Sequence, residues 1–308
     1  MPRLIRFTPL LLVMLLAWQQ VASVGIDSDW GIDLQNALHM PWFATLTLLL
    51  VLWSRQWRVT DRMRWCIVVV AMLAGAGGSE IVQSFTGRDA ELQDCARDLL
   101  GGGAALLGYR AVCVSGRQRW LAVAGACLLV AIGLATFVRS SAALIARPLI
   151  APVLFDPAGY FSRTFATPIV ADAVRGAPAD RWRLRLLAGR WQGFELPQPY
   201  TDWRPYARLC LRLDVADNQP LALLVRIHDA AHSASGNAYN DRFNRHITLT
   251  PGVHLVDIDL ADVAHGPQWR RLNMAAIANL GVYQLPPFTA GRLLDAGPIW
   301  LTRAPHCE

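Results

Sequence analysis

Long apolar segments occupy the first half of the chain, and short alternating segments occupy the second half. Five apolar stretches, each close to the roughly 20 residues that an α-helix needs to cross a bilayer, lie at residues 4–24, 38–53, 65–85, 99–114 and 120–138. From about Pro148 onward, short strand-like runs are separated by turn residues. The pattern predicts an α-helical membrane bundle of about five transmembrane helices over residues 1–138, followed by an all-β sandwich domain over residues 139–308.

The arginines between these stretches predict the orientation of the bundle. If the N-terminus is cytoplasmic, nine arginines lie on the cytoplasmic side, and only Arg88 and Arg97 lie on the opposite side. Because positive residues are retained in the cytoplasm, we expect a multi-pass protein of a bacterial inner membrane whose C-terminal domain is periplasmic. An alternative interpretation of the first stretch is a cleaved signal peptide, because Arg3 and Arg6 precede its apolar core.

Composition and charge exclude some classes of function. All 29 basic residues are arginine, and the net charge is +6. They form no basic run and accompany no nucleic-acid motif, so no nucleic-acid partner is expected. The sequence has no cysteine–histidine metal spacing, nucleophile elbow or phosphate-binding glycine loop, so no metal and no cofactor are expected. In an oxidising periplasm, Cys210 and Cys307 could form a disulfide.

Polar side chains recur at regular intervals between the third and fourth apolar stretches. Two pairs of them are three and four residues apart, so the members of each pair share a helix face. An arginine lies on the connecting hairpin, and a histidine lies at the same depth in the second helix. With the two pairs, they make up the candidate catalytic residues: His39, Glu80, Gln83, Arg88, Asp94 and Asp98. Ionisable groups at a membrane boundary usually mark a functional site. The alternative is a structural staple, in which Arg88 neutralises Glu80 and the aspartates favour a helix N-terminus.

The spacing of these residues resembles the signature of the VanZ-like membrane family over roughly residues 1–115. The matching positions are His39, Glu80, Gln83, Gly87, Arg88, Asp94, Asp98 and Gly101. Asp98 stands where the family usually has Asn, and Gln35 and Asn36 do not match the acid and Lys that commonly precede the histidine. The resemblance implies a small polytopic membrane protein of a group that is linked in part to glycopeptide-antibiotic resistance, and it implies no defined biochemical activity.

The second half is similar to galactose-binding-like jelly rolls that serve as carbohydrate-binding modules, over about residues 148–303. Its predicted strands include "RLCLRLDV", "LALLVRIHD", "HITLT", "HLVDIDL" and "GPIWL". Trp191, Trp203 and Tyr239 are placed around turns, where aromatic faces could stack on sugar rings. The alternative for each tryptophan is a position in the core of the sandwich.

One loop of the second half collects polar groups that a ligand site would use. Carboxylate, imidazole, amide and guanidinium groups gather there in Asp229, His232, Asn240, Asp241 and Arg242. Such a set suits a sugar or calcium site. Alternatively, Asp241 and Arg242 pin the loop by local hydrogen bonds.

These patterns favour a protein that contacts bilayer lipid and binds an envelope glycan or a lipid-linked sugar through its outer sandwich. Anchoring a weak sugar-binding domain raises its effective concentration at the membrane. One alternative is a membrane enzyme that acts on lipid-linked glycan or peptidoglycan precursors, with Glu80 or Asp94 as general acid or base and His39 assisting. A further alternative is an assembly scaffold in which only the small-residue helix faces matter.

Overall fold

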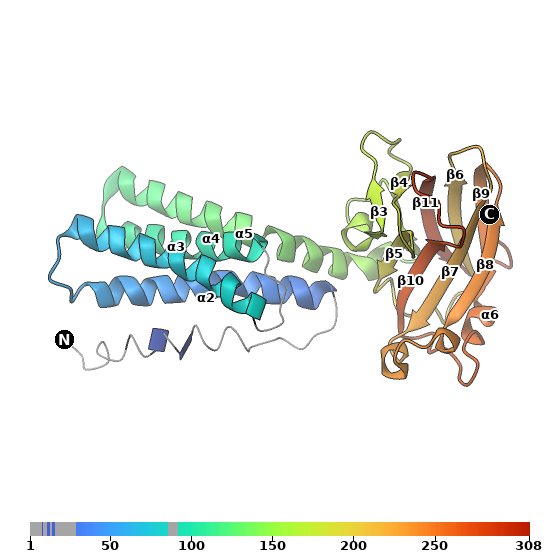
Figure 1. Ribbon diagram of the computed structural model, residues 1–308, viewed down its shortest axis with the longest axis horizontal. Helices are drawn as coiled ribbons and strands as arrows, with labels where there is room; N and C mark the ends of the chain where they lie inside the picture. Colours follow the sequence, from blue (N-terminus) through green and yellow to red (C-terminus); the bar gives the residue numbers. More distant parts are fainter. Residues whose placement is uncertain (1–7, 9–10, 13, 16–28, 86–91) are drawn as a thin grey trace. The chain divides into compact units, whose positions relative to one another are not determined.

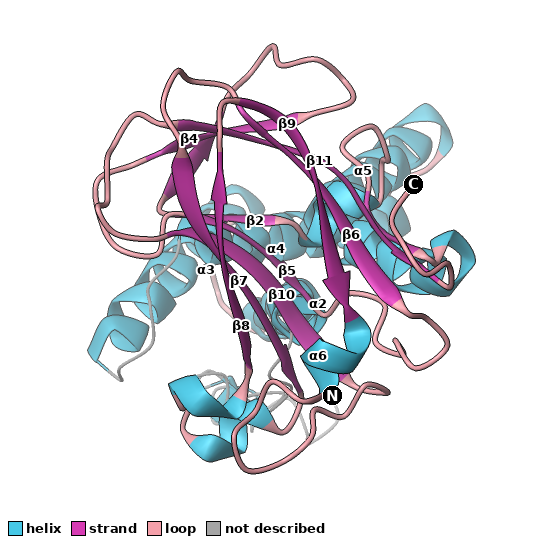
Figure 2. Cartoon of the chain, turned by 90° about the vertical axis from the view of Figure 1, so that its right-hand side faces the viewer, coloured by secondary structure: helices cyan, strands magenta, loops and turns pink. Residues whose placement is uncertain are grey.

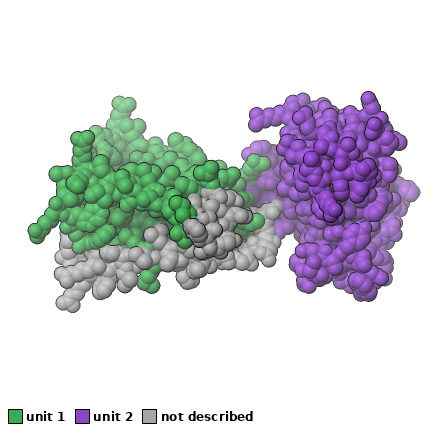
Figure 3. Space-filling view, in the orientation of Figure 1, with its two compact units in different colours: residues 1–139 green, residues 140–308 purple. Residues whose placement is uncertain are grey.

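A computed structural model describes residues 8, 11–12, 14–15, 29–85 and 92–308 of the chain. The first predicted membrane stretch lies mostly outside the described residues, and Arg88 lies outside them too. The chain divides into two compact units, Met1–Arg139 and Ser140–Glu308 (Figure 3). The sequence prediction placed this boundary after residue 138.

The described part of the first unit is helical. Its helices, the last of which continues into the second unit, are α2 (Asp29–Ser54), α3 (Asp61–Phe85), α4 (Leu92–Cys113) and α5 (Gly116–Ile150) (Figure 1). α2 and α4 pack closely, because a Cβ added at Gly101 would lie 2.3 Å from the carbonyl oxygen of Met40. Small residues permit this close approach of two helix backbones.

Two of the described helices have the length and apolar composition of a membrane span. They are Trp30–Ser54, within α2, and Gly116–Ile150, which is α5. α4 carries Asp94, Arg97 and Asp98 in its first turns, and only two spans are found where five were expected. The structure therefore establishes a helical first half, and the five-helix membrane bundle remains a prediction.

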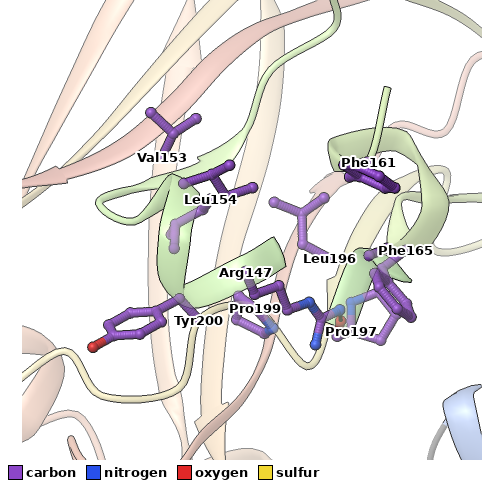
Figure 4. A pocket seen from close by; sticks show the side chains of 11 residues that line it. Arg147, Val153, Leu154, Phe161, Phe165, Leu196, Pro197, Pro199 and Tyr200 are labelled. Carbon is purple, nitrogen blue, oxygen red and sulfur yellow. Dashed lines mark hydrogen bonds between the residues drawn. The ribbon is translucent and has the colours of Figure 1, made fainter. Parts of the chain in front are cut away.

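α5 continues twelve residues beyond the predicted end at Val138, and its last turns belong to the second unit. The helix continues past Arg139 to Ile150 and has Pro148 in its last turn. Arg147 holds this end in place: its guanidinium carbon lies 3.7 Å from the centroid of the Phe165 ring, and its Nη2 donates to the carbonyl of Pro197 over 3.3 Å (Figure 4). The cavity beneath these side chains has a volume of about 20 Å³. That is room for about one water molecule, so this cavity is part of the packing and is too small to be a ligand site.

The rest of the second unit is a sandwich of two antiparallel sheets (Figure 2). One sheet has the order β3-β4-β11-β6-β9 with β1 beside β11, and the other has the order β2-β5-β10-β7-β8. The strands are β1 (Val153–Phe155), β2 (Thr167–Ile169), β3 (Ala171–Ala173), β4 (Trp182–Leu186), β5 (Gly193–Pro197), β6 (Arg208–Val215), β7 (Leu221–Asp229), β8 (Phe243–Leu249), β9 (Gly252–Asp259), β10 (Ile277–Gln284) and β11 (Leu293–Thr302).

Short helical turns complete this unit. They are the 3₁₀ turns η2 (Ser162–Phe165), η3 (His232–Ser235) and η4 (Tyr239–Asp241), and the helix α6 (Leu260–Ala264). Asp259 caps α6 by accepting a hydrogen bond from the Ala261 N–H over 2.8 Å.

The alternating pattern of two strands was sufficient to predict their bounds. "RLCLRLDV" and "LALLVRIHD" coincide with β6 and β7. Their inward side chains, such as Leu211 and Val225, join one continuous core between the two sheets. The sandwich is thus confirmed, and a disulfide joins Cys210 of β6 to Cys307, with a Cα–Cα distance of 5.7 Å.

Candidate functional site

The outer face of the five-stranded sheet carries an ordered array of polar side chains. Its strands point alternate residues toward the core, so the remaining residues face outward. The register places Glu195 and Arg226 on either side of Gly281, and Asn244 follows beside Arg226. A second row on the same face lies two residues further along each strand. In it Tyr283 pairs with Leu224, and Leu224 pairs with His246.

Glu195 is the centre of this array. Its Oε1 accepts hydrogen bonds from Arg226 Nη2, over 2.7 Å, and from the hydroxyl of Tyr283. Its Oε2 accepts from Asn279 Nδ2 over 3.0 Å. The Tyr283 ring lies across Gly281, since a Cβ at that position would come within 2.5 Å of the ring. Burial raises the pKa of Tyr283 well above its usual range, so the phenol stays protonated and donates.

A groove of about 310 Å³ opens beside this array. Its walls are Arg190, Trp191, Leu224, Tyr239, His246, Gln284, Leu285, Pro286 and Phe288. Three aromatic side chains in this set are accessible: Trp191 is 48% exposed, Tyr239 50% and Phe288 37%. Trp191 also meets Tyr283 edge to face, with ring centroids 6.0 Å apart, so a wall of the groove contacts the polar array.

Tyr239 is held over the sheet by the polypeptide around it. Its hydroxyl lies 3.4 Å from Nε2 of His246, and Asn244 Nδ2 donates to its carbonyl over 2.9 Å. The guanidinium carbon of Arg242 lies 5.2 Å from the centroid of its ring. The loop residue Tyr239 thereby becomes a fixed wall of the groove.

His228 lies on the same outer face but contributes no charge. Its ring is 4.5 Å from that of His232, and its Nδ1 is 3.3 Å from the carbonyl of Asp229. Burial lowers the pKa of His228 to about 4, so its imidazole is neutral at neutral pH.

The loop that was expected to bind a sugar or calcium is instead closed by an arginine from another segment. Arg270 donates to both oxygens of Asp229, over 2.6 and 2.8 Å, and to both oxygens of Asp241, over 2.5 and 2.8 Å. His232 Nδ1 lies 3.2 Å from Asp241 Oδ2. Hydrogen bonds from Arg270 hold the pKa of Asp241 far below its usual range. Burial opposes a similar shift at Asp229, but the hydrogen bonds from Arg270 and the Asn273 N–H outweigh it and lower its pKa.

The structure therefore corrects the prediction of a ligand site at three residues of this loop. Asp229 and Asp241 are buried and paired with Arg270, and His232 is buried against Asp241, so these side chains are already engaged within the protein. Asn240 is exposed, and its carbonyl accepts from the Gln268 N–H over 2.9 Å. Across the described ranges, no group of three His, Cys, Asp or Glu side chains could hold a metal ion.

Trp203 is also corrected. It is fully buried in the core of the sandwich, and its indole N–H donates to the carbonyl of Tyr200 over 2.5 Å. Of the aromatic candidates, Trp191 and Tyr239 line the groove. Glu195, Arg226, Tyr283 and His246 were not among the predicted site residues. The alternation of inward and outward residues along β7 was the signal that could have found Arg226.

The helical unit brings part of the other candidate set together. His39 of α2 lies with Nδ1 2.9 Å from Asp98 Oδ1 and Nε2 3.8 Å from Asp94 Oδ2, and all three side chains are buried. Arg97, which was not among the candidates, donates to Asp94 Oδ1. Glu80 and Gln83 belong to α3, but their side chains lie outside the described part of the structure.

Comparison with known proteins yields only remote likenesses. No protein-family model matches the chain, and no curated protein matches it. An exo-beta-agarase is 16% identical at a TM-score of 0.38, over 50% of this chain and 25% of that one. The family 11 carbohydrate-binding module from Clostridium thermocellum, in complex with a beta-1,3-1,4-mixed-linked tetrasaccharide, is 12% identical at a TM-score of 0.32, over 45% of this chain and 84% of that one. A mutant of a family 29 carbohydrate-binding module is 10% identical at a TM-score of 0.32, over 49% of this chain and 89% of that one.

The chain spans about a quarter of the length of the agarases that it matches. Likenesses this remote define neither a family nor an activity. The VanZ-like resemblance of the first half rests on its sequence motif alone, because no family model matches.

Proposed function

We propose that the protein is a membrane-anchored glycan-binding protein, whose sandwich holds a carbohydrate chain in the groove of the five-stranded sheet. The observation that carries this proposal is the placement of Trp191, Tyr239 and Phe288 around one groove, each with an accessible ring. Aromatic rings provide large contact surfaces with an apolar face. Groove volumes near 300 Å³ and above, with a few placed polar groups, are typical of small-ligand sites.

The polar array supplies the orientation that stacking alone does not. Glu195, Arg226 and Asn279 are already hydrogen-bonded to one another through Glu195, so their positions are set before a ligand arrives. A rigid site loses less conformational entropy on binding. This suits recognition of a chain whose hydroxyl groups point in fixed directions.

The helices suit the role of an anchor. Only 6% of the most apolar stretch of α5 is buried within the protein, so its apolar side chains face outward, as they would toward lipid. With the orientation expected from the arginines, the sandwich would lie in the periplasm of a bacterium. The envelope glycan or lipid-linked sugar would then be bound close to the bilayer, where tethering raises the effective concentration.

Removing the exposed indole tests the glycan-binding role. In purified full-length protein in detergent, we expect Trp191→Ala to weaken polysaccharide binding about 30-fold, as loss of an aromatic contact worth about 2 kcal/mol does. Binding is measured on an array of bacterial surface polysaccharides and plant glucans. Tyr160→Ala removes an exposed ring outside the groove and should bind as the wild type does. A folded wild-type protein that binds no polysaccharide on the array would refute the proposal.

The buried cluster in the helical unit favours a second candidate function, an enzyme of lipid-linked glycan or peptidoglycan precursors. An imidazole between two carboxylates, as His39 lies between Asp94 and Asp98, has the arrangement of an oriented general base. Production of the wild-type protein in cells should then change the pool of lipid-linked precursors, measured by mass spectrometry of extracted lipids. His39→Gln should abolish that change while the protein accumulates normally. Identical precursor pools with and without the wild-type protein would exclude the enzyme.

A further inference from the structure

The groove and the sheet beneath it carry an excess of positive charge. Two of the lining side chains, Arg190 and His246, are basic types, and none of the nine is acidic. The acidic residues on the five strands of this sheet are Glu195 and Asp229. Each of them is already paired with an arginine, Glu195 with Arg226 and Asp229 with Arg270.

Arg242 is the unusual member of this group. Its side chain is buried, with 7% of the residue exposed, yet no carboxylate of the described chain lies within ion-pair distance of it. Arg242 instead contacts two uncharged side chains. Its Nε donates to Asn244 Oδ1 over 3.1 Å, and its guanidinium group faces the Tyr239 ring. Burial and the nearby charge of Arg226 lower the pKa of Arg242, but it remains a cation.

A buried charge without a counter-charge destabilises a folded protein. Ionisable groups in such perturbed surroundings cluster at functional sites. Arg242 contacts the ring of Tyr239, which is a wall of the groove, and Arg190 lines the same groove with no ion pair to a described acidic side chain. Both cations therefore raise the electrostatic potential at the place where a ligand would lie.

We propose that the groove selects acidic glycans, in which a carboxylate, sulfate or phosphate substituent takes the place of the missing counter-charge. The proposal rests on the proposed glycan-binding function and names its ligand class. A neutral sugar chain would satisfy the aromatic walls but leave Arg242 without a partner. An anionic substituent placed beside Tyr239 would interact with both arginines in a partly dehydrated setting, where charge–charge interactions are strong.

A matched pair of polysaccharides tests the ligand class. Full-length protein in detergent is run in native affinity gels that contain polygalacturonate or its fully methyl-esterified form, which has the same backbone without the charge. Dextran sulfate and dextran form a second pair, which separates carboxylate from sulfate recognition. We expect binding of at least one acidic polymer to exceed that of its neutral partner by about tenfold or more, and to weaken as sodium chloride is raised.

Variants assign that preference to the groove. Arg242→Gln and Arg190→Gln should each reduce binding of the acidic polymer about tenfold more than binding of its neutral partner. Arg212→Gln removes the same charge from an exposed position on β6, in the other sheet, and should have no such effect. Thermal unfolding of Arg242→Gln should occur at the wild-type temperature or above it, because an uncompensated buried charge has been removed.

The outcomes separate this inference from the function on which it rests. Equal binding of acidic and neutral polymers would overturn the inference and leave glycan binding standing. Equal losses in Arg212→Gln and Arg242→Gln would show general attraction to a basic protein, and would also overturn it. If Arg242→Gln fails to fold, Arg190→Gln, which alters an exposed side chain, decides the matter alone. Absence of binding to every polymer would refute the proposed function itself.

Discussion

Replacing Arg270 by Gln is expected to lower the free energy of unfolding of the sandwich by about 3–5 kcal/mol, because two buried carboxylates would lose the arginine that pairs with both of them. The Asp229 side chain has no exposed surface, and that of Asp241 is 11% exposed. Neither carboxylate can recover its hydration in the folded state. The loss is measured as the shift in urea-induced unfolding of the full-length protein, followed by tryptophan fluorescence.

A surface ion pair provides the control for this substitution. Arg204 and Asp202 bond in the same two-point geometry, at 2.8 Å for each contact, but Arg204 is 66% exposed. Solvent screens such pairs, so Arg204→Gln should leave the unfolding midpoint unchanged. If Arg270→Gln were equally silent, the buried network would not be the element that holds this loop. Because the loop carries Tyr239, Arg270→Gln should also weaken glycan binding.

Breaking the Cys210–Cys307 disulfide is expected to have the second large effect, a loss of about 3–5 kcal/mol of unfolding free energy. The bond joins residues 97 apart in the sequence. A loop of that length strongly restricts the unfolded chain, so reduction stabilises the unfolded state. It also joins the C-terminal segment to β6, which lies between β11 and β9 in its sheet.

Dithiothreitol provides the measurement and its control. The unfolding midpoint of the wild-type protein should fall on reduction, and that of the double variant Cys210→Ser, Cys307→Ser should already be low and should not respond. Cys127→Ser, which removes an exposed free thiol of α5, should behave as the wild type does. A wild-type midpoint indifferent to the reductant would contradict a stabilising role. A stabilising disulfide would in turn support the expected periplasmic location, since such bonds persist in oxidising compartments.

Periodicity in the sequence was enough to predict the two architectures and some contacts within them. The long apolar segments predicted helices and the alternating segments predicted strands, with β6 and β7 matched along their whole length. The spacing of Asp94 and Asp98 placed both on one helix face, and they do meet His39. The same alternation could have assigned Arg226 to the outer face. The bounds of β6 and β7 and the face that Asp94 shares with Asp98 are relations within one segment, which local backbone geometry determines.

The composition of the groove depends on the order and register of separate strands, and the sequence pattern does not specify either. Glu195 acquires its role only because β10 lies between β5 and β7 and brings Tyr283 and Asn279 beside it. Arg270 pairs with Asp241 and Asp229, which lie 29 and 41 residues away in the sequence and were predicted to contact a ligand. Trp203, near a turn, is buried in the core because of contacts between separate segments.

By itself the sequence determined which side chains each helix or strand could present on a common face. The tertiary structure decided which faces meet, because burial and charge pairing act between segments that are distant in the chain.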